Sequence, residues 1–345
     1  MTLRIGWWDH FEQQQGIPLA QQYDERLNLL KRAEGYGFYG YHVAEHHLTP
    51  LDMAPSPLVF LTAAARETST IRLGSLVLVL PLYNPVRLVQ ELCMVDNLSH
   101  GRLMPGVGRG VRDVEHEWFG HAPEEARERF QETFEVLRLT LASDEFDHTR
   151  KHHSYEHLPT NFTSYQKPMR FWYAGNLRGA ADGAMNVIGV GDREAYDYFA
   201  ETWAAKRASG DPAYQGEEPI AGSTRRIVIA ETDEEAAEIA ERAWVVYQSN
   251  FRATSLRLDG GPGPAAPDWD AEGSPARRGG VIFGSPQTVR DVLRESMERL
   301  GPNHTYFAPA FQWGDLSHQE ARRTMDLFAE HVMPALTAVH TNAAA

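Results

Sequence analysis

A carboxylate and two imidazoles, Glu45-His46-His47, stand together in the run YGYHVAEHHLTP. Residues 40–44 before them have strand character, and Leu48-Thr49-Pro50 after them indicates a turn. The triplet is therefore expected where a strand passes into a loop, which is where α/β enzymes place their reactive groups. Imidazole exchanges protons near neutral pH, so proton transfer is the chemistry that these residue types favour.

The same residues could instead bind a metal ion. Adjacent side chains diverge on a strand, so a divalent site would need ligands from other strand ends, and Asp9, His10 and Glu45 could supply them. A metal-dependent hydrolase therefore stays an open alternative. Four more histidines, at 148, 152, 153 and 157, fall in a polar stretch and are expected to be solvated.

The composition describes a chain with enough apolar residues for a large core. It has 345 residues, 42% hydrophobic and 23% charged, which suffices for one large α/β domain or two smaller ones. The net charge of −14 argues against a broad cationic face for nucleic acid or an anionic membrane. Without a membrane-spanning stretch or a signal peptide, the protein is expected to be cytoplasmic. The lone cysteine, Cys93, is expected to be a small buried residue.

Strand-like and helix-like segments alternate along the chain, which is typical of a parallel sheet covered by crossover helices. The strongest strand signal is IRLGSLVLVL at 71–80, a nearly continuous apolar run that ends at Pro81. The eight predicted strands are 3–8, 39–44, 71–80, 101–108, 170–174, 186–190, 226–230 and 304–309. The main predicted helices are 18–35, 58–67, 85–98, 124–141, 196–208, 233–247, 285–300 and 316–333.

This alternation predicts an α/β fold, a (β/α)8 TIM barrel with insertions, in a single domain over 1–345. An open doubly wound sheet is the alternative, but the first strand is followed by WWDHFEQQQG and not by a Gly-rich nucleotide-binding fingerprint. The polar stretch 143–168 is predicted to be an insertion without regular structure. The Gly- and Pro-rich segment 256–280 is predicted to be a mobile lid loop.

In such a barrel, residues just past the C-terminal ends of the strands converge on one face, which brings Trp8 to the triplet. Arg109, between Gly108 and Gly110, is suited to bind a phosphate, because guanidinium binds it bidentately and glycine leaves room. A structural arginine that binds loop carbonyls is the alternative. Asn176, before a short helix, offers a second anion-binding position. Together these residues predict a pocket for a planar, phosphorylated cofactor.

The sequence resembles the bacterial luciferase-like, flavin-dependent monooxygenases, of the luciferase α-subunit type, over nearly its whole length. The segments that carry the resemblance are AEHHLTP at 44–50, RLGSLVLVLPLYNPVRLVQELCMVDNLSHGRL at 72–103, GVGRGVRDVEHEWFG at 106–120, GSPQTVRDVL at 284–293 and FQWGDLSHQEARRTMDLFAEHVMPAL at 311–336. Their order and spacing together make the match strong.

The resemblance implies a (β/α)8 barrel that binds reduced FMN at its C-terminal face and activates O2 as a flavin C4a-hydroperoxide. By position, His46 is similar to a histidine that luciferase α subunits require, with Glu45 before it as an active-site carboxylate that is expected to orient or charge it. Arg109 is similar to the arginine that contacts the FMN phosphate. The flavin ring is expected against Trp8 and Leu76-Val77, where the family often has a non-proline cis peptide.

Two positions depart from the family pattern. Gly108 stands where luciferase α subunits have a reactive cysteine, which argues against light emission as the physiological role. YAGNLRG at 173–179 lacks the usual Ser/Thr-rich phosphate segment, so Asn176, Arg178 and the backbone N–H groups of Gly175 to Gly179 are expected as substitutes.

The resulting hypothesis is a monooxygenase that oxidises a small, apolar organic substrate with O2 and reduced FMN. A separate NAD(P)H:flavin reductase delivers the cofactor, no metal takes part, and the lid excludes water. A homodimer through helices near 58–67 and 85–98 is implied by the resemblance. A deazaflavin-dependent oxidoreductase that transfers hydride, and a non-catalytic flavin-binding subunit, are the alternatives.

Overall fold

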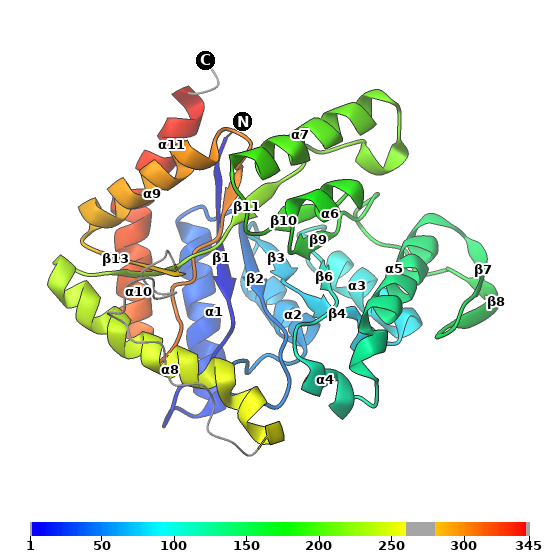
Figure 1. Ribbon diagram of the computed structural model, residues 1–345, viewed down its shortest axis with the longest axis horizontal. Helices are drawn as coiled ribbons and strands as arrows, with labels where there is room; N and C mark the ends of the chain where they lie inside the picture. The colour runs from blue at the N-terminus through cyan, green and yellow to red at the C-terminus, as the bar shows by residue number, and fades with distance from the viewer. Residues whose placement is uncertain (1, 260–279, 343–345) are drawn as a thin grey trace.

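Eight parallel strands form a closed barrel (Figure 1). The largest sheet has the order β4-β6-β9-β10-β11-β14-β1-β2-β3-β5 in the computed structural model, which describes residues 2–259 and 280–342. β3 (Arg72–Ser75) continues into β4 (Leu78–Val79), and β5 (Leu103–Met104) continues into β6 (Gly106–Gly108). β3 pairs with β5, and β4 pairs with β6. The continuous strands β3/β4 and β5/β6 are therefore neighbours at both ends of this order, and the sheet closes into a barrel. The predicted fold class is confirmed.

The helices lie outside the barrel and cover its strands (Figure 1). The remaining barrel strands are β1 (Arg4–Asp9), β2 (Gly40–Val43), β9 (Trp172–Ala174), β10 (Asn186–Ile188), β11 (Ala221–Ser223) and β14 (Tyr306–Phe307). The helices are α1 (Leu19–Gly35), α2 (Pro57–Glu67), α3 (Pro85–Leu98), α4 (Asp113–Trp118), α5 (Ala126–Ala142), α6 (Leu177–Asp182), α7 (Arg193–Ala208), α8 (Asp233–Asp259), α9 (Pro286–Leu300), α10 (His318–Leu327) and α11 (Met333–Asn342).

The seventh barrel strand is not the one that the sequence predicted. RIVI forms β12 (Arg226–Ile229), which pairs with β13 (Val281–Gly284) in a separate parallel sheet. The barrel position is taken by β11, whose residues Ala-Gly-Ser lack an apolar run. Small residues are required there, because a Cβ at Gly222 would lie 2.1 Å from the carbonyl oxygen of Tyr306 on β14.

The stretch 143–168 contains a regular element, contrary to the prediction. β7 (Glu145–Thr149) and β8 (Ser154–Pro159) form an antiparallel hairpin outside the barrel, beside α5 (Figure 1). Glu132 of α5 accepts the backbone N–H groups of His152 and His153 and so ties the hairpin turn to the helix. His148 is buried, at 6% exposure, because it faces the same carboxylate; the prediction that it is solvated is wrong.

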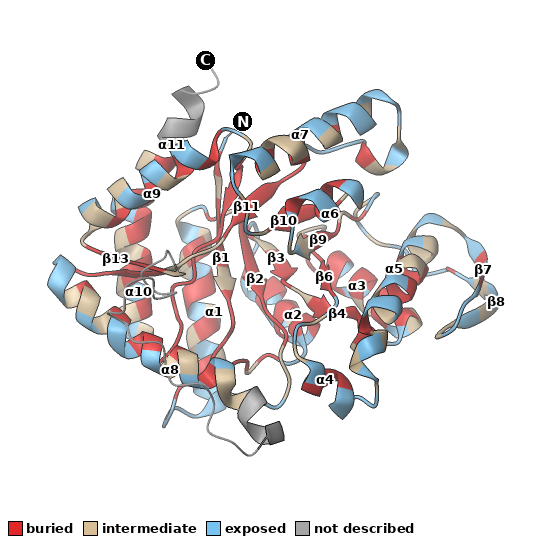
Figure 2. Ribbon diagram, viewed as in Figure 1, coloured by how far each residue is buried: buried red, intermediate tan, exposed pale blue. Residues whose placement is uncertain are grey.

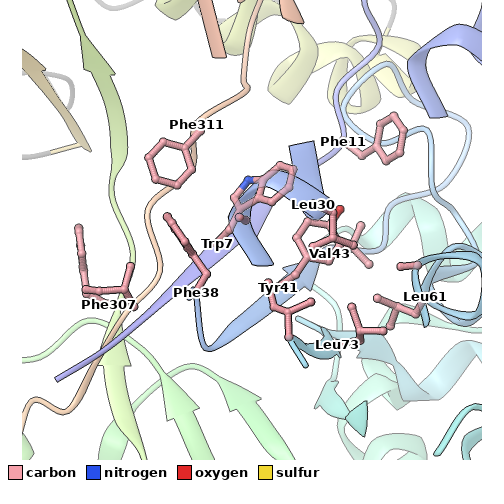
Figure 3. Close-up of a cluster of buried hydrophobic side chains, with 14 of the residues drawn as sticks. Trp7, Phe11, Leu30, Phe38, Tyr41, Val43, Leu61, Leu73, Phe307 and Phe311 are labelled. Atoms are coloured by element: carbon pink, nitrogen blue, oxygen red, sulfur yellow. The ribbon is translucent and has the colours of Figure 1, made fainter. Parts of the chain in front are cut away.

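The core occupies both faces of the barrel wall (Figure 2). Between the wall and the helices, Trp7 and Tyr41 on β1 and β2 pack with their ring centroids 4.6 Å apart, among the apolar side chains of Figure 3. Inside the barrel the strands contribute a second cluster: Leu76, Met104, Trp172, Ile188, Ile220, Tyr306 and Ala308. The interior below the C-terminal ends is therefore packed, and a ligand must bind above it.

Three smaller predictions have outcomes in the structure. Cys93 on α3 is buried, as predicted, and burial raises the pKa of its thiol to about 11.

α8 continues to Asp259, past its predicted end at Tyr247, so the first residues of the predicted lid are helical. The rest of that lid, 260–279, lies outside the described residues. Within the described part of the chain, no helix is both long and apolar enough to cross a membrane.

Candidate active site

His46 follows the end of β2 and is held from two sides. Its backbone N–H donates to Asp52 Oδ2 at 2.9 Å, and its ring Nδ1 lies 3.1 Å from Glu115 Oε1. Glu115 belongs to α4, 69 residues farther along the chain. The His46 side chain is 12% exposed and that of Glu115 is 2% exposed. The pair is an imidazole that reaches the surface of the site, backed by a buried carboxylate.

The Glu115 carboxylate is maintained in its charged form. Burial opposes the charge, but the hydrogen bond and the charge of the His46 ring, with the backbone N–H of His47 at 3.0 Å, hold the pKa of Glu115 below its ordinary value. An ionised acceptor at Nδ1 fixes the proton on that nitrogen and leaves Nε2 of His46 to exchange protons with a bound molecule.

Asp52 fixes the loop that carries His46. Its Oδ1 accepts the backbone N–H of Ala54 at 2.6 Å while Oδ2 accepts that of His46. Burial raises the pKa of Asp52 well above its ordinary value, against the effect of these two N–H donors. The loop backbone is therefore anchored below the surface of the site.

Glu45 bonds to His47 and not to His46. Its Oε1 lies 2.8 Å from His47 Nε2, and its Oε2 accepts from the Val79 N–H at 3.0 Å and from the Tyr83 hydroxyl at 2.9 Å. The prediction that Glu45 orients His46 is wrong, because adjacent side chains leave the chain in different directions. These contacts connect the end of β2 to the turn after β4.

His10 and Trp8 bring the end of β1 to the same site. The His10 ring centroid lies 4.4 Å from that of Trp8 and 5.6 Å from that of His46, and the ring stacks on Tyr247 of α8 at 6.1 Å. Burial, followed by the positive charge of Arg226, holds the pKa of His10 well below its ordinary value. His10 is therefore a neutral wall of the site at neutral pH.

The ends of β4 and β6 meet at a glycine, Gly108. The Leu76–Val77 peptide bond is cis, as the resemblance implied. Val79 pairs with Gly108 across the two strands, and a Cβ on Gly108 would lie 2.5 Å from Val77 Cγ2. A side chain at 108 would require Val77 to move, so packing as well as sequence excludes the reactive cysteine of luciferase α subunits.

Arg109 comes directly after β6, and its side chain is exposed. Over 2–259 and 280–342, its guanidinium forms no ion pair with another residue. It follows Gly108 directly, and its position and unpaired charge fit a bound anion.

The second predicted phosphate segment is engaged within the protein. Asn176 accepts the Gly179 N–H at 2.6 Å and so caps α6. Arg178 Nη2 pairs with Glu194 at 2.8 Å, and the Gly175 N–H donates to the carbonyl of Ile188 at 3.3 Å. Of the predicted phosphate ligands, Arg109 has the position that fits an anion best.

The metal alternative has no support in the geometry. Asp9 is fully buried, with Oδ2 2.8 Å from Arg26 Nε and 2.8 Å from the Tyr41 hydroxyl. Glu45 is committed to the contacts described above. Within the described residues, no group of three or more His, Cys, Asp or Glu side chains is arranged to hold a metal ion.

A sequence model of the luciferase-like monooxygenases matches residues 3–304. The chain belongs to this family. Among curated relatives, the uncharacterised protein y4wF of Sinorhizobium fredii is 31% identical over 320 residues, which cover 91% of this chain and 92% of the relative. Limonene 1,2-monooxygenase of Rhodococcus erythropolis is 26% identical over 325 residues, which cover 89% and 80%.

Solved structures show the same fold. The monooxygenase RslO1 of Streptomyces bottropensis superposes with a TM-score of 0.80 at 24% identity, covering 96% of this luciferase-like chain and 99% of that one. The oxygenating constituent of 3,6-diketocamphane monooxygenase of Pseudomonas putida, in complex with FMN, has a TM-score of 0.74 at 17% identity, covering 96% and 98%. An F420-dependent secondary alcohol dehydrogenase has a TM-score of 0.69 at 17% identity, covering 97% and 99%.

Sequence reasoning missed the partner of His46. Glu115 lies within GVGRGVRDVEHEWFG, one of the segments that carry the family resemblance, but the spacing did not indicate that it faces His46. Arg112 and Arg226, which also reach the site in this luciferase-like protein, carried no sequence signal either.

Proposed function

We propose that this protein is the oxygenase component of a two-component monooxygenase, supplied with reduced FMN by a separate reductase. Bound reduced FMN would supply the two electrons with which one atom of O2 is inserted into an organic substrate. Membership of the luciferase-like monooxygenases and the name of the limonene-oxidising relative support this class of reaction. The Pseudomonas relative is called an oxygenating constituent, which supports a separate reductase.

The His46–Glu115 pair carries the proposal. Glu115 holds the His46 ring by Nδ1, which leaves Nε2 as the position where a proton is held or released next to the reacting groups. Trp8, Leu76-Val77 and Gly108 would contact the flavin ring, and Arg109 would hold its phosphate.

Oxygen incorporation is the experiment that tests this function. Purified protein, an NADH:FMN reductase and a panel of small organic compounds, both uncharged and carboxylate-bearing, are incubated under 18O2, and products are analysed by mass spectrometry. One 18O atom in a product supports the proposal. Turnover that continues without O2 and requires a deazaflavin would replace it with hydride transfer, the reaction class of the F420-dependent dehydrogenase that shares this fold. No turnover with either cofactor would favour the non-catalytic subunit.

Arg109→Gln tests the phosphate assignment. We expect the variant to bind FMN roughly tenfold or more weakly than wild type, because a hydrogen bond to a charged group is lost. Riboflavin has no phosphate and should bind both proteins equally, as measured by fluorescence titration. Arg178→Gln is the matched control, since that arginine already pairs with Glu194. An equal loss of affinity for FMN and riboflavin would contradict the assignment.

The proposal includes a homodimer through α2 and α3. These adjacent helices expose Val59 at 71%, Met94 at 51% and Leu98 at 40%, a concentration of apolar surface that a second copy would cover. Sedimentation of the wild type and of a Val59→Glu, Met94→Glu double variant tests it. A wild type that sediments as a monomer rules this interface out.

A further inference from the structure

Two arginines reach the active site next to His10 and do not form ion pairs. Arg226 is the first residue of β12, and Arg112 precedes α4. The positive charge of each acts on His10, so both guanidinium groups lie near its ring. In the part of the chain that the structure describes, neither has a carboxylate within ion-pairing distance. The chain carries 47 acidic and 33 basic residues, so unpaired neighbouring arginines are not the result of a shortage of carboxylates.

Aromatic rings hold both guanidinium groups in place. Arg226 lies over the Tyr247 ring, 3.6 Å from its centroid, and 5.5 Å from the centroid of Trp8. Arg112 lies 4.1 Å from the centroid of the Phe251 ring, and its Nη2 donates to the Phe251 carbonyl at 2.7 Å. Stacking fixes a guanidinium without neutralising its charge, so the charge remains for a ligand.

Both groups also retain hydrogen-bonding capacity. The Nε atoms of Arg112 and Arg226 are buried and have no acceptor among the described residues. A buried donor without a partner is destabilising, and an acceptor on a ligand would remove that cost. Nε and a terminal N–H of one guanidinium form the fork that matches the two oxygens of a carboxylate.

Glu12 is the acidic group that acts on Arg226, without forming an ion pair with it in the described part of the chain. It is fully buried and accepts a hydrogen bond from Asn250 Nδ2 at 2.9 Å. Burial raises the pKa of Glu12, which weakens its tendency to be ionised. His10 contributes no positive charge at neutral pH, for the reason given above. The positive charge next to His10 comes from Arg226 and Arg112.

Arg226 lies apart from the site proposed for the FMN phosphate, whereas Arg112 follows Arg109 by three residues, between β6 and α4. β12 leads away from the barrel beside β14 and β1, whereas Arg109 follows β6, on the other side of β2 and β3/β4 in the strand order. We propose that Arg112 and Arg226 bind a carboxylate group of the substrate, so that the physiological substrate is a small organic acid. This inference rests on the proposed function, because it assigns the substrate class of the same site, and it replaces the purely apolar substrate that the sequence suggested.

Direct binding of a carboxylate tests the inference without the cofactor. Benzoate and its uncharged analogue benzamide are titrated by calorimetry into the full-length protein as purified, at constant ionic strength and without added FMN. We expect benzoate to bind at least tenfold more tightly than benzamide, and Arg226→Gln or Arg112→Gln to abolish that preference. Arg178→Gln is the matched control and should bind benzoate as the wild type does. Thermal unfolding of each variant reports whether the fold is intact.

Each alternative result has a defined meaning. Equal binding of benzoate and benzamide by the wild type, or benzoate binding that Arg226→Gln and Arg112→Gln leave unchanged, overturns the inference. A weaker affinity for FMN, but not riboflavin, in these two variants would assign the arginines to the cofactor phosphate and also overturns it. Because no flavin or O2 takes part in the titration, it can fail while 18O incorporation succeeds, and the reverse.

Discussion

Two neighbouring histidine–carboxylate pairs in this site have different surroundings. His46–Glu115 and His47–Glu45 resemble each other in exposure, with histidines at 12% and 14% and carboxylates at 2% and 1%. Glu45 additionally binds a backbone N–H and a tyrosine hydroxyl and so connects two strand ends. Within the described residues, Glu115 receives its side-chain hydrogen bonds from the two histidine residues alone. Identical residue types therefore form one pair that we propose exchanges protons and one pair that connects two strand ends.

Substitution of the two histidines should separate these roles most strongly. In His46→Gln, we expect kcat to fall about 10²- to 10⁴-fold, because a positioned acid–base group is lost. In His47→Gln, kcat should remain within about threefold of wild type, since His47 is assigned to the structural pair. Steady-state oxygen consumption with saturating reduced FMN measures both. Similar losses in the two variants would show that the pairs do not differ in function.

Substitution of the two carboxylates should affect stability in the opposite order, with the larger loss in the His47–Glu45 pair. Glu45→Gln places an amide NH2 where one of the Val79, Tyr83 or His47 donors now finds an oxygen. We expect it to lower the free energy of unfolding by about 1–3 kcal/mol. Glu115→Gln should cost less, because fewer anchoring contacts are lost. Urea denaturation measures the two values, and a larger loss for Glu115→Gln would contradict the structural role of Glu45.

The smallest of the expected effects is on the pH dependence of stability, and it tests whether Glu115 is coupled to His46. The pKa of Glu115 is lower in the folded protein than its ordinary value of 4.5, so the unfolded chain binds this proton at a higher pH than the folded chain does. The stabilisation is present above pH 4.5 and is lost as the pH falls below it. Unfolding midpoints of wild type and Glu115→Gln between pH 6 and pH 3.5, in roughly half-unit steps, should converge at the acid end. Parallel curves would show that this carboxylate is not coupled to His46 in the folded state.

The sequence predicted much of the architecture because local patterns encode it. Apolar runs such as 71–80 and the helical segments between them sufficed for the barrel, and the family resemblance located the cis peptide at Leu76–Val77. The seventh strand could not be found in this way. β11 is Ala-Gly-Ser, which has no strand signal, while the apolar RIVI of β12 has a strong one. Because β11 lies close to β14, small residues are needed there, and a strand of small residues lacks the apolar pattern from which strands are predicted.

The sequence by itself determined that His46, Glu45 and His47 lie at a strand end and that Arg109 lies between glycines, because these properties depend on neighbours along the chain. Tertiary structure alone decided which carboxylate each histidine binds, and it brought Arg112 and Arg226 to the same ring. Glu115 and His46 are 69 residues apart, and Arg226 comes close to His10 only because β12 and α8 pack against the barrel. Contacts of this kind depend on distance in space. Closure of the barrel determines that distance, and the local sequence does not.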